Sequence, residues 1–184
     1  GDYIRRYQIG VIGSASGDIS REVRATAREL GRVIASKNLI LFSGACPGLP
    51  LEAALGAKEN NGTTVGVSPA IDLKEHTDDY KYPTDIFDSL IFTGSGYKGR
   101  NVTLVRSCDA VISVQGMIGT LNELTIAYDE KKIIGLLSGT GGASDLFLGI
   151  LNNMEKSTEN VIYSKDPLVL VEKILEILDS LRGQ

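Results

Sequence analysis

The sequence predicts an α/β fold in which a mostly parallel sheet of about seven strands carries helices on both faces. Short apolar runs alternate along the whole chain with longer segments of three- and four-residue apolar spacing, a pattern typical of doubly wound folds. The 21 glycines gather where the apolar runs end, as expected for loops that join strands to helices. The apolar runs are nearly continuous, which indicates strands buried on both faces of a parallel sheet.

The first strand is expected over residues 8–12, before the small-residue loop 13–17. A helix follows over 19–34, with apolar positions at helical spacing, arginines between them and Asp18 as the expected N-cap. The unit then repeats, with a strand over 39–42, a loop over 43–48, a helix over 51–59 and a third strand over 63–67. The polar stretch 68–85 has no clear period, so we expect a mobile surface loop there.

The second half continues the alternation. We expect strands over 90–92, 110–114, 133–137 and 161–164. Helices are expected over 101–107, 119–130 and 145–155, and Asp166 and Pro167 open a final helix. Glycine-rich turns at 93–99 and 115–118 precede two of these helices. In such a fold ligands bind beyond the carboxyl ends of the strands, where the strand order reverses, so functional residues should lie in these loops.

Length and charge limit the classes of function. The 184 residues fit one domain, 1–184, and the net charge of −4 provides no basic field for binding nucleic acid or an anionic membrane. No apolar run approaches the roughly 20 residues of a membrane span, and the first ten residues lack the apolar stretch of a signal peptide. We therefore expect a cytoplasmic protein whose partner is a small molecule, for example one that carries a phosphate.

Metal binding and histidine chemistry are not expected. The two cysteines, Cys46 and Cys108, lie far apart in the sequence without a metal-ligand spacing, and we expect two buried, reduced thiols. The one histidine, His76, lies in the polar stretch LKEHTDDYKYP and is expected in a surface loop. No metal site is predicted.

The loop Gly13-Ser14-Ala15-Ser16-Gly17 follows a strand and precedes a helix. Small residues there allow backbone N–H groups and hydroxyls to approach a phosphate, so Gly13, Ser14 and Ser16 are candidate ligand-binding residues. The glycine spacing does not match the dinucleotide fingerprint, which argues against a nicotinamide-dependent oxidoreductase. Gly44 is a further candidate, in the loop after the second strand.

The segment Gln115-Gly116-Met117-Ile118-Gly119-Thr120-Leu121-Asn122-Glu123 carries the strongest motif. Gly116, Gly119 and Thr120 form a turn at the start of a helix, where free N–H groups can bind one phosphate. Glu123 lies one turn further along and can reach a neighbouring group such as a sugar hydroxyl, or it can simply stabilise the helix terminus. Arg100 follows another glycine-rich turn, where its guanidinium can reach a phosphate or a sugar, or where it can simply be a solvated loop arginine.

Taken together, Arg100, the Gly119-Thr120-x-x-Glu123 motif and the loops 13–17 and 43–48 resemble the Lonely Guy (LOG) proteins. These are Rossmann-like proteins once labelled lysine decarboxylases, and the sequence looks closest to the branch that includes molybdenum-cofactor carrier proteins. The resemblance implies hydrolysis of the N-glycosidic bond of a nucleoside 5′-monophosphate, with Arg100 and Glu123 as catalytic residues and Gly116, Gly119 and Thr120 at the phosphate. It implies no metal or cofactor for hydrolysis, and a homodimer or homotetramer.

Two departures from the enzymes' motif keep an alternative open. The enzymes have Pro-Gly-Gly-x-Gly-Thr-x-x-Glu, whereas Gln115 replaces the proline here and Met117 replaces the second glycine. The retained Arg100 and Glu123 favour a phosphoribohydrolase, in which a carboxylate stabilises the positive charge that develops on the ribose. The two replacements favour a non-catalytic protein that binds a nucleotide or carries the molybdenum cofactor.

Overall fold

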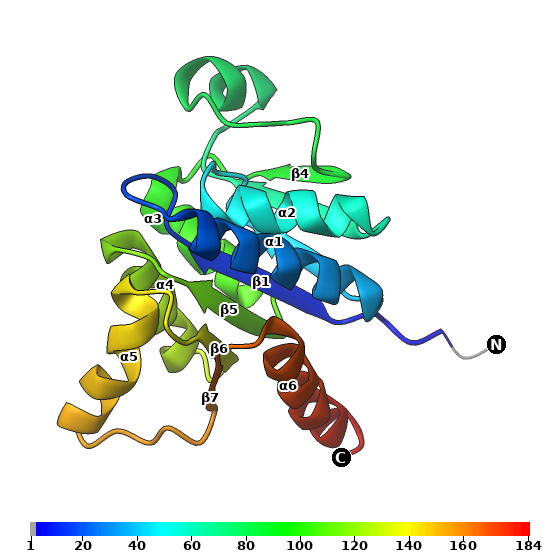
Figure 1. Cartoon of the computed structure of the whole chain (residues 1–184). Coiled ribbons are helices and arrows are strands. Elements are labelled where there is room, and N and C mark those ends of the chain that lie inside the picture. Colours follow the sequence, from blue (N-terminus) through cyan, green and yellow to red (C-terminus); the bar gives the residue numbers. More distant parts are fainter. Residues whose placement is uncertain (1–2) are drawn as a thin grey trace.

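A computed structural model describes residues 3–184 as a sheet with helices on both sides (Figure 1). The strands are β1 (Gln8–Gly13), β2 (Ile40–Ser43), β3 (Thr63–Ser68), β4 (Ser89–Phe92), β5 (Ala110–Val114), β6 (Ile133–Leu137) and β7 (Val161–Ser164). The helices are α1 (Arg21–Ser36), α2 (Leu49–Glu59), α3 (Gly96–Arg106), α4 (Ile118–Asp129), α5 (Gly142–Asn153) and α6 (Pro167–Arg182), and a short π-helical turn, η1, spans Glu75–Asp79.

The seven strands form one sheet in the order β4-β3-β2-β1-β5-β6-β7, and every neighbouring pair is parallel. This confirms the predicted fold class, with the strand order reversing between β1 and β5. Gly13 pairs with Val114, so β1 and β5 end side by side. The loops that follow these two strands therefore lie next to each other, at the position where doubly wound folds bind ligands.

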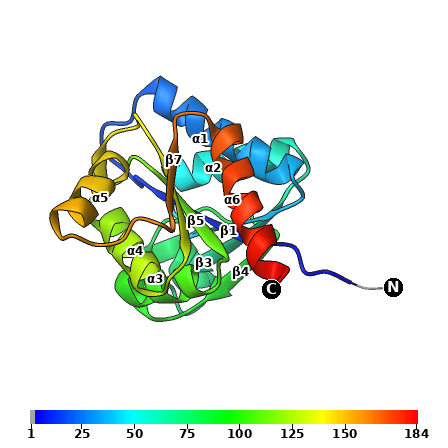
Figure 2. The same ribbon diagram turned by 90° about the horizontal axis from the view of Figure 1, so that it is seen from below.

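Two apolar cores lie on opposite faces of the sheet. One face packs against α1, α2 and α6, through side chains such as Leu30, Ala53 and Ile174. The other face packs against α3, α4 and α5, through side chains such as Leu104, Leu124 and Phe147. Figure 2 shows the two helix layers on either side of the strands. The interior strands β1, β5 and β6 are buried on both faces, which explains their continuous apolar sequence.

Helices α1 and α2 cross at glycines. A Cβ at Gly31 would lie 1.8 Å from the carbonyl oxygen of Ala53, and a Cβ at Gly56 would lie 1.9 Å from that of Arg28. The two backbones therefore touch, and no larger side chain fits between them without moving a helix. On the outer surface, Arg28 and Arg32 both bind Glu59, which ties the two helices together across the solvent side.

Several predicted helix starts were wrong. Helix α1 is capped by Ser20, whose side chain accepts from the N–H of Val23, and not by Asp18, because the helix begins two residues later than expected. Helix α3 begins at Gly96, within the segment predicted as a turn, so Arg100 lies inside the helix. Glycines there suggest a turn, yet Gly96 has a φ of +69° and serves as the bend that starts the helix.

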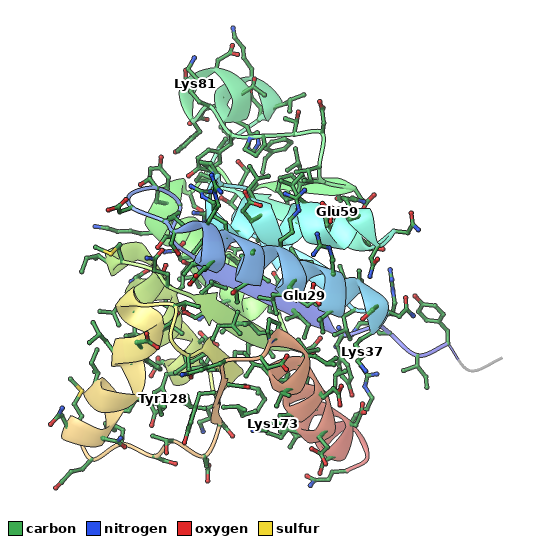
Figure 3. All side chains as sticks on the ribbon, in the orientation of Figure 1. Glu29, Lys37, Glu59, Lys81, Tyr128 and Lys173 are labelled. Atoms are coloured by element: carbon green, nitrogen blue, oxygen red, sulfur yellow. The ribbon has the colours of Figure 1, made fainter. Side chains whose placement is uncertain are left out.

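The polar stretch 68–85 is partly helical, and the expectation of a surface histidine in it was wrong. His76 is fully buried. Its Nδ1 lies 2.7 Å from Ser68 Oγ and its Nε2 lies 2.9 Å from the carbonyl oxygen of Pro83. The Pro83 oxygen can only accept, so Nε2 carries the proton and Nδ1 accepts from the serine hydroxyl. The histidine ring is therefore buried with both nitrogens hydrogen-bonded, although the sequence around it is polar. Figure 3 shows Lys81 in this segment, which projects beyond the end of the sheet.

No helix within residues 3–184 has the length and apolar character that a membrane crossing requires.

Candidate functional site

A cavity of about 290 Å³ opens at the carboxyl ends of β1 and β5. Its position is the one predicted from the fold, beside the point at which the strand order reverses. The lining residues come from the end of β1, from the loops after β1, β2, β3 and β5, and from the beginnings of α2, α3 and α4. They are Val11, Ile12, Gly13, Ser14, Ala15, Ser16, Gly44, Cys46, Pro50, Tyr82, Tyr97, Arg100, Asn101, Met117, Gly119, Thr120 and Glu123.

Eight of the nine candidate residues line this cavity. They are Gly13, Ser14, Ser16, Gly44, Arg100, Gly119, Thr120 and Glu123. The ninth, Gly116, does not belong to the lining. Its N–H donates to Ser14 Oγ at 2.9 Å and its carbonyl accepts from Ala143 N at 2.8 Å, so its backbone groups are used within the protein. Gly116 joins the loops after β1 and β5, which fixes their relative position.

Arg100 is buried and its guanidinium is held from one side. Nη1 donates to the carbonyl oxygens of Gly44 and, at 3.2 Å, of Val67, and Nε donates to Asn101 Oδ1 at 3.2 Å. Within residues 3–184, Nη2 has no hydrogen-bond partner. A Cβ at Gly44 would lie 2.4 Å from Nη1, so a glycine is required where the guanidinium packs. The arrangement presents one fixed positive group with open donors to the cavity.

Glu123 lies on α4 in the same cavity and is half-buried. Within residues 3–184 no donor hydrogen-bonds its carboxyl group, so no hydrogen bond offsets the cost of burying the charged carboxylate. Burial raises the pKa of Glu123 to about 7, against a smaller lowering by the charge of Arg100. Near neutral pH this group therefore exists as a mixture of carboxylic acid and carboxylate, and it can donate a hydrogen bond, accept one or exchange a proton.

The first turn of α4 supplies free backbone donors. Met117 occupies the N-cap position and makes no side-chain cap bond, and within residues 3–184 no acceptor meets the N–H groups of Gly119 and Thr120. Open space surrounds the position where a Cβ of Gly119 would lie. The helix dipole and these donors favour an anion at this end of the cavity.

Both cysteines are buried, and one of them lies at the cavity. Cys46 and Cys108 are both buried free thiols, as predicted. Cys46 lies in the cavity wall, and burial raises its pKa to about 11, so it stays protonated and unreactive at neutral pH. Among residues 3–184 no group of three or more histidine, cysteine, aspartate or glutamate side chains is arranged to hold a metal ion.

Comparison with known proteins shows the family to which the chain belongs. The model of the SLOG cluster4 family matches residues 6–171. The chain belongs to that family. An uncharacterised protein from Archaeoglobus fulgidus is 37% identical to this SLOG cluster4 protein over 130 residues, which cover 71% of this chain and 79% of that one.

Two solved structures cover almost the whole of both chains. The molybdenum cofactor binding protein from Rippkaea orientalis is 28% identical, with a TM-score of 0.77, over 96% of this chain and 99% of that one. The molybdenum cofactor carrier protein from Chlamydomonas reinhardtii is 31% identical, with a TM-score of 0.75, over 94% and 99%. The resemblance to Rossmann-like LOG proteins, in the branch with molybdenum-cofactor carriers, is thereby confirmed.

Tyr82 and Tyr97 are among the cavity residues that sequence reasoning missed. Tyr82 belongs to the polar stretch after β3 and Tyr97 to the first turn of α3. Tyr82 lies in neither a periodic apolar pattern nor a glycine-rich motif, whereas Tyr97 lies within the glycine-rich segment 93–99, from which only Arg100, the next residue, was taken as a candidate. The sequence did carry one signal in its composition, since three of the seven tyrosines lie within residues 80–97.

Proposed function

We propose that this SLOG cluster4 protein binds and carries the molybdenum cofactor, a phosphorylated pterin derivative. The observation that carries the proposal is the convergence of the free N–H groups of α4 and the guanidinium of Arg100 on one cavity. A backbone anion site with one fixed arginine is the donor set that a single phosphate group needs. The two solved relatives are a molybdenum cofactor binding protein and a molybdenum cofactor carrier protein, and each matches nearly from end to end.

The state of Glu123 supports a carrier. A carboxylate beside a bound phosphate would repel it, whereas a group with a pKa near 7 can take up a proton and donate a hydrogen bond. The same residue then recognises ring or sugar oxygens without opposing the anion. Met117 at the cavity rim, 70% exposed, occupies the position at which the hydrolases resembled by the sequence have glycine.

Hydrolysis of a nucleoside 5′-monophosphate is the second candidate. It is favoured by the presence of Arg100 and Glu123 in one cavity, with the carboxyl group unpaired among residues 3–184. In this reading the phosphate binds at the start of α4 and the carboxylate form of Glu123 faces the ribose. As the bond to the base breaks, positive charge develops on the ribose. The carboxylate of Glu123 would therefore stabilise the transition state more than the ground state.

One experiment separates the two. The purified protein is incubated anaerobically with cofactor released from a molybdoenzyme, desalted and assayed for retained molybdenum. In parallel, a panel of purine, pyrimidine and modified nucleoside 5′-monophosphates is tested for release of free base. The carrier predicts about one molybdenum per chain and no base release. Base release that is lost in both Arg100→Ala and Glu123→Gln would instead establish the hydrolase.

The matched control is Arg21→Ala, which removes an exposed arginine from α1. It should retain molybdenum as the unmodified protein does, while Arg100→Ala should retain little. Equal retention by Arg100→Ala and the unmodified protein would contradict the carrier proposal.

A homodimer or homotetramer is also proposed. An apolar surface on α4 and α5 supports it, with Met117, Ile118 and Leu146 between 63% and 79% exposed. Met117 also lines the ligand cavity, so a second copy on this surface would lie beside the site. Sedimentation of Ile118→Glu tests it: the variant should be smaller than the unmodified protein, and an unchanged mass would refute the use of this surface.

A further inference from the structure

Two tyrosines form a wall of the ligand cavity, and they come from different segments of the chain. Tyr82 belongs to the stretch after β3, and Tyr97 to the first turn of α3. Their ring centroids lie 6.5 Å apart, and Tyr80 packs against both, at 5.5 Å from Tyr82 and 5.2 Å from Tyr97. Tyr97 is 55% exposed and Tyr82 is half-buried, so both rings keep surface that a ligand can reach.

Tyr82 is held in place by buried groups behind it. The ring of His76 meets it edge to face, with centroids 5.6 Å apart and planes at 85°. His76 is itself fixed between Ser68 Oγ and the carbonyl oxygen of Pro83, the residue after Tyr82. The histidine therefore ties Tyr82 to the carboxyl end of β3. Such support fixes the ring before any ligand arrives, which lowers the cost of ordering it on binding.

The aromatic wall and the anion-binding groups line the same cavity but come from different elements. The free N–H donors belong to the first turn of α4, whereas the tyrosines belong to the segment after β3 and to α3. Arg100 lies on α3, one turn after Tyr97, and reaches back to the carbonyl oxygens of Gly44 and Val67. A ligand that fills the cavity therefore meets donors for an anion and flat apolar faces together.

We propose that Tyr82 and Tyr97 stack against a flat conjugated ring, and that this wall selects phosphate ligands that carry a purine or pterin ring over phosphates that lack one. Tyrosine suits this role because its rigid, amphipathic ring offers contact area at little cost in conformational freedom. Stacking tolerates different rings because each has a π-face. The tyrosines would therefore select ligands that carry a flat conjugated ring, and polar groups would distinguish one such ring from another. This inference rests on the proposed function, since it presupposes that the phosphate binds at α4.

The test compares GMP with ribose 5-phosphate. Guanine shares the 2-amino-4-oxopyrimidine ring of a pterin, and ribose 5-phosphate keeps the phosphate and sugar without any ring. Affinities are measured by calorimetry for the unmodified protein and for Tyr82→Leu, Tyr97→Leu and Tyr82→Phe. Tyr163→Leu is the matched control, because Tyr163 is 58% exposed on the edge strand β7 at the other side of the sheet.

The unmodified protein should bind GMP more tightly than ribose 5-phosphate. Each leucine variant should weaken GMP by roughly 5- to 150-fold and leave ribose 5-phosphate within about twofold, whereas Tyr82→Phe and Tyr163→Leu should change neither. Circular dichroism and thermal melting check that every variant is folded. The phenylalanine variant keeps the ring, so it distinguishes stacking from a role of the hydroxyl.

Two results would overturn the inference while the phosphate site stands: equal affinity of the unmodified protein for both ligands, or equal weakening of both ligands in the leucine variants. Loss of GMP binding in Tyr82→Phe would also overturn it, because it would assign recognition to the hydroxyl. If the unmodified protein bound neither ligand and retained no molybdenum cofactor, the proposed function and this inference would fail together.

Discussion

Replacing Gly44 by alanine should disable the site through Arg100 alone. The added methyl group would lie 2.4 Å from Nη1 and 2.7 Å from Cζ of Arg100, closer than real Cβ contacts. The guanidinium is buried and held by backbone carbonyls, so it must move away from Gly44 and Val67 to make room. A hydrogen bond to a charged group contributes about 1.5–3 kcal/mol. Loss of the contact between Arg100 and a bound phosphate should therefore weaken binding of GMP roughly 10- to 150-fold.

The assay pairs calorimetric titration with GMP and thermal unfolding. Gly149→Ala is the control, since no atom lies within 4 Å of its Cβ position in the middle of α5. This control should bind GMP normally and gain about 0.5–1 kcal/mol of stability, the usual benefit of alanine over glycine in a helix. Normal GMP affinity in a folded Gly44→Ala protein would refute the assignment of Arg100 to the phosphate.

Three further predictions concern stability and reactivity. Burial raises the pKa of Glu123 from its ordinary 4.5 to about 7, so the folded protein binds more protons than the unfolded chain between these values and the free energy of unfolding falls as pH rises through them. Glu123→Gln should remove this fall. In urea unfolding, the free energy of unfolding of the variant minus that of the unmodified protein should be about 2–3 kcal/mol larger at pH 8 than at pH 4. A difference that is the same at both pH values would contradict the prediction. Gly31→Ala should force α1 and α2 apart and lower stability by about 1–3 kcal/mol in the same assay, whereas an unchanged midpoint would show that the helices can separate freely. Cys108, which is buried and does not line the cavity, should react with a thiol reagent only at the rate of unfolding, and fast labelling of Cys108 in the folded protein would refute its burial.

The fold could be predicted because its determinants are local and repetitive. Continuous apolar runs such as residues 110–114 lie in the sheet interior, and the glycine-rich loops after β1 and β5 occur where the strand order reverses. Candidate cavity residues could be found because Arg100 follows the glycine-rich segment 93–99 after β4 and Glu123 follows the glycine-rich loop after β5. The element starts were harder: Ser20 rather than Asp18 caps α1, since both residue types cap helices equally well and the tertiary fold decides.

The remainder of the site depends on contacts between distant segments. His76 is buried because Ser68 and the carbonyl oxygen of Pro83 meet its two ring nitrogens, and nothing in the surrounding polar sequence indicates that pairing. Gly116 has the sequence environment of a phosphate loop, yet its N–H is taken by Ser14 from a loop about a hundred residues earlier. Tyr82 reaches the cavity only because its segment folds back over β3.

The sheet order has a consequence for how the protein assembles. The strands β4, β3, β2 and β1 lie on one side of the β1–β5 boundary and β5, β6 and β7 lie on the other, so each half of the chain builds a contiguous half of the sheet. The cavity takes Ser14 and Tyr82 from the first half and Arg100 and Glu123 from the second. Binding competence therefore arises only when the halves dock. A ligand that binds across this boundary binds only when both halves are folded together, so it should raise the free energy of unfolding of the whole chain rather than of one half.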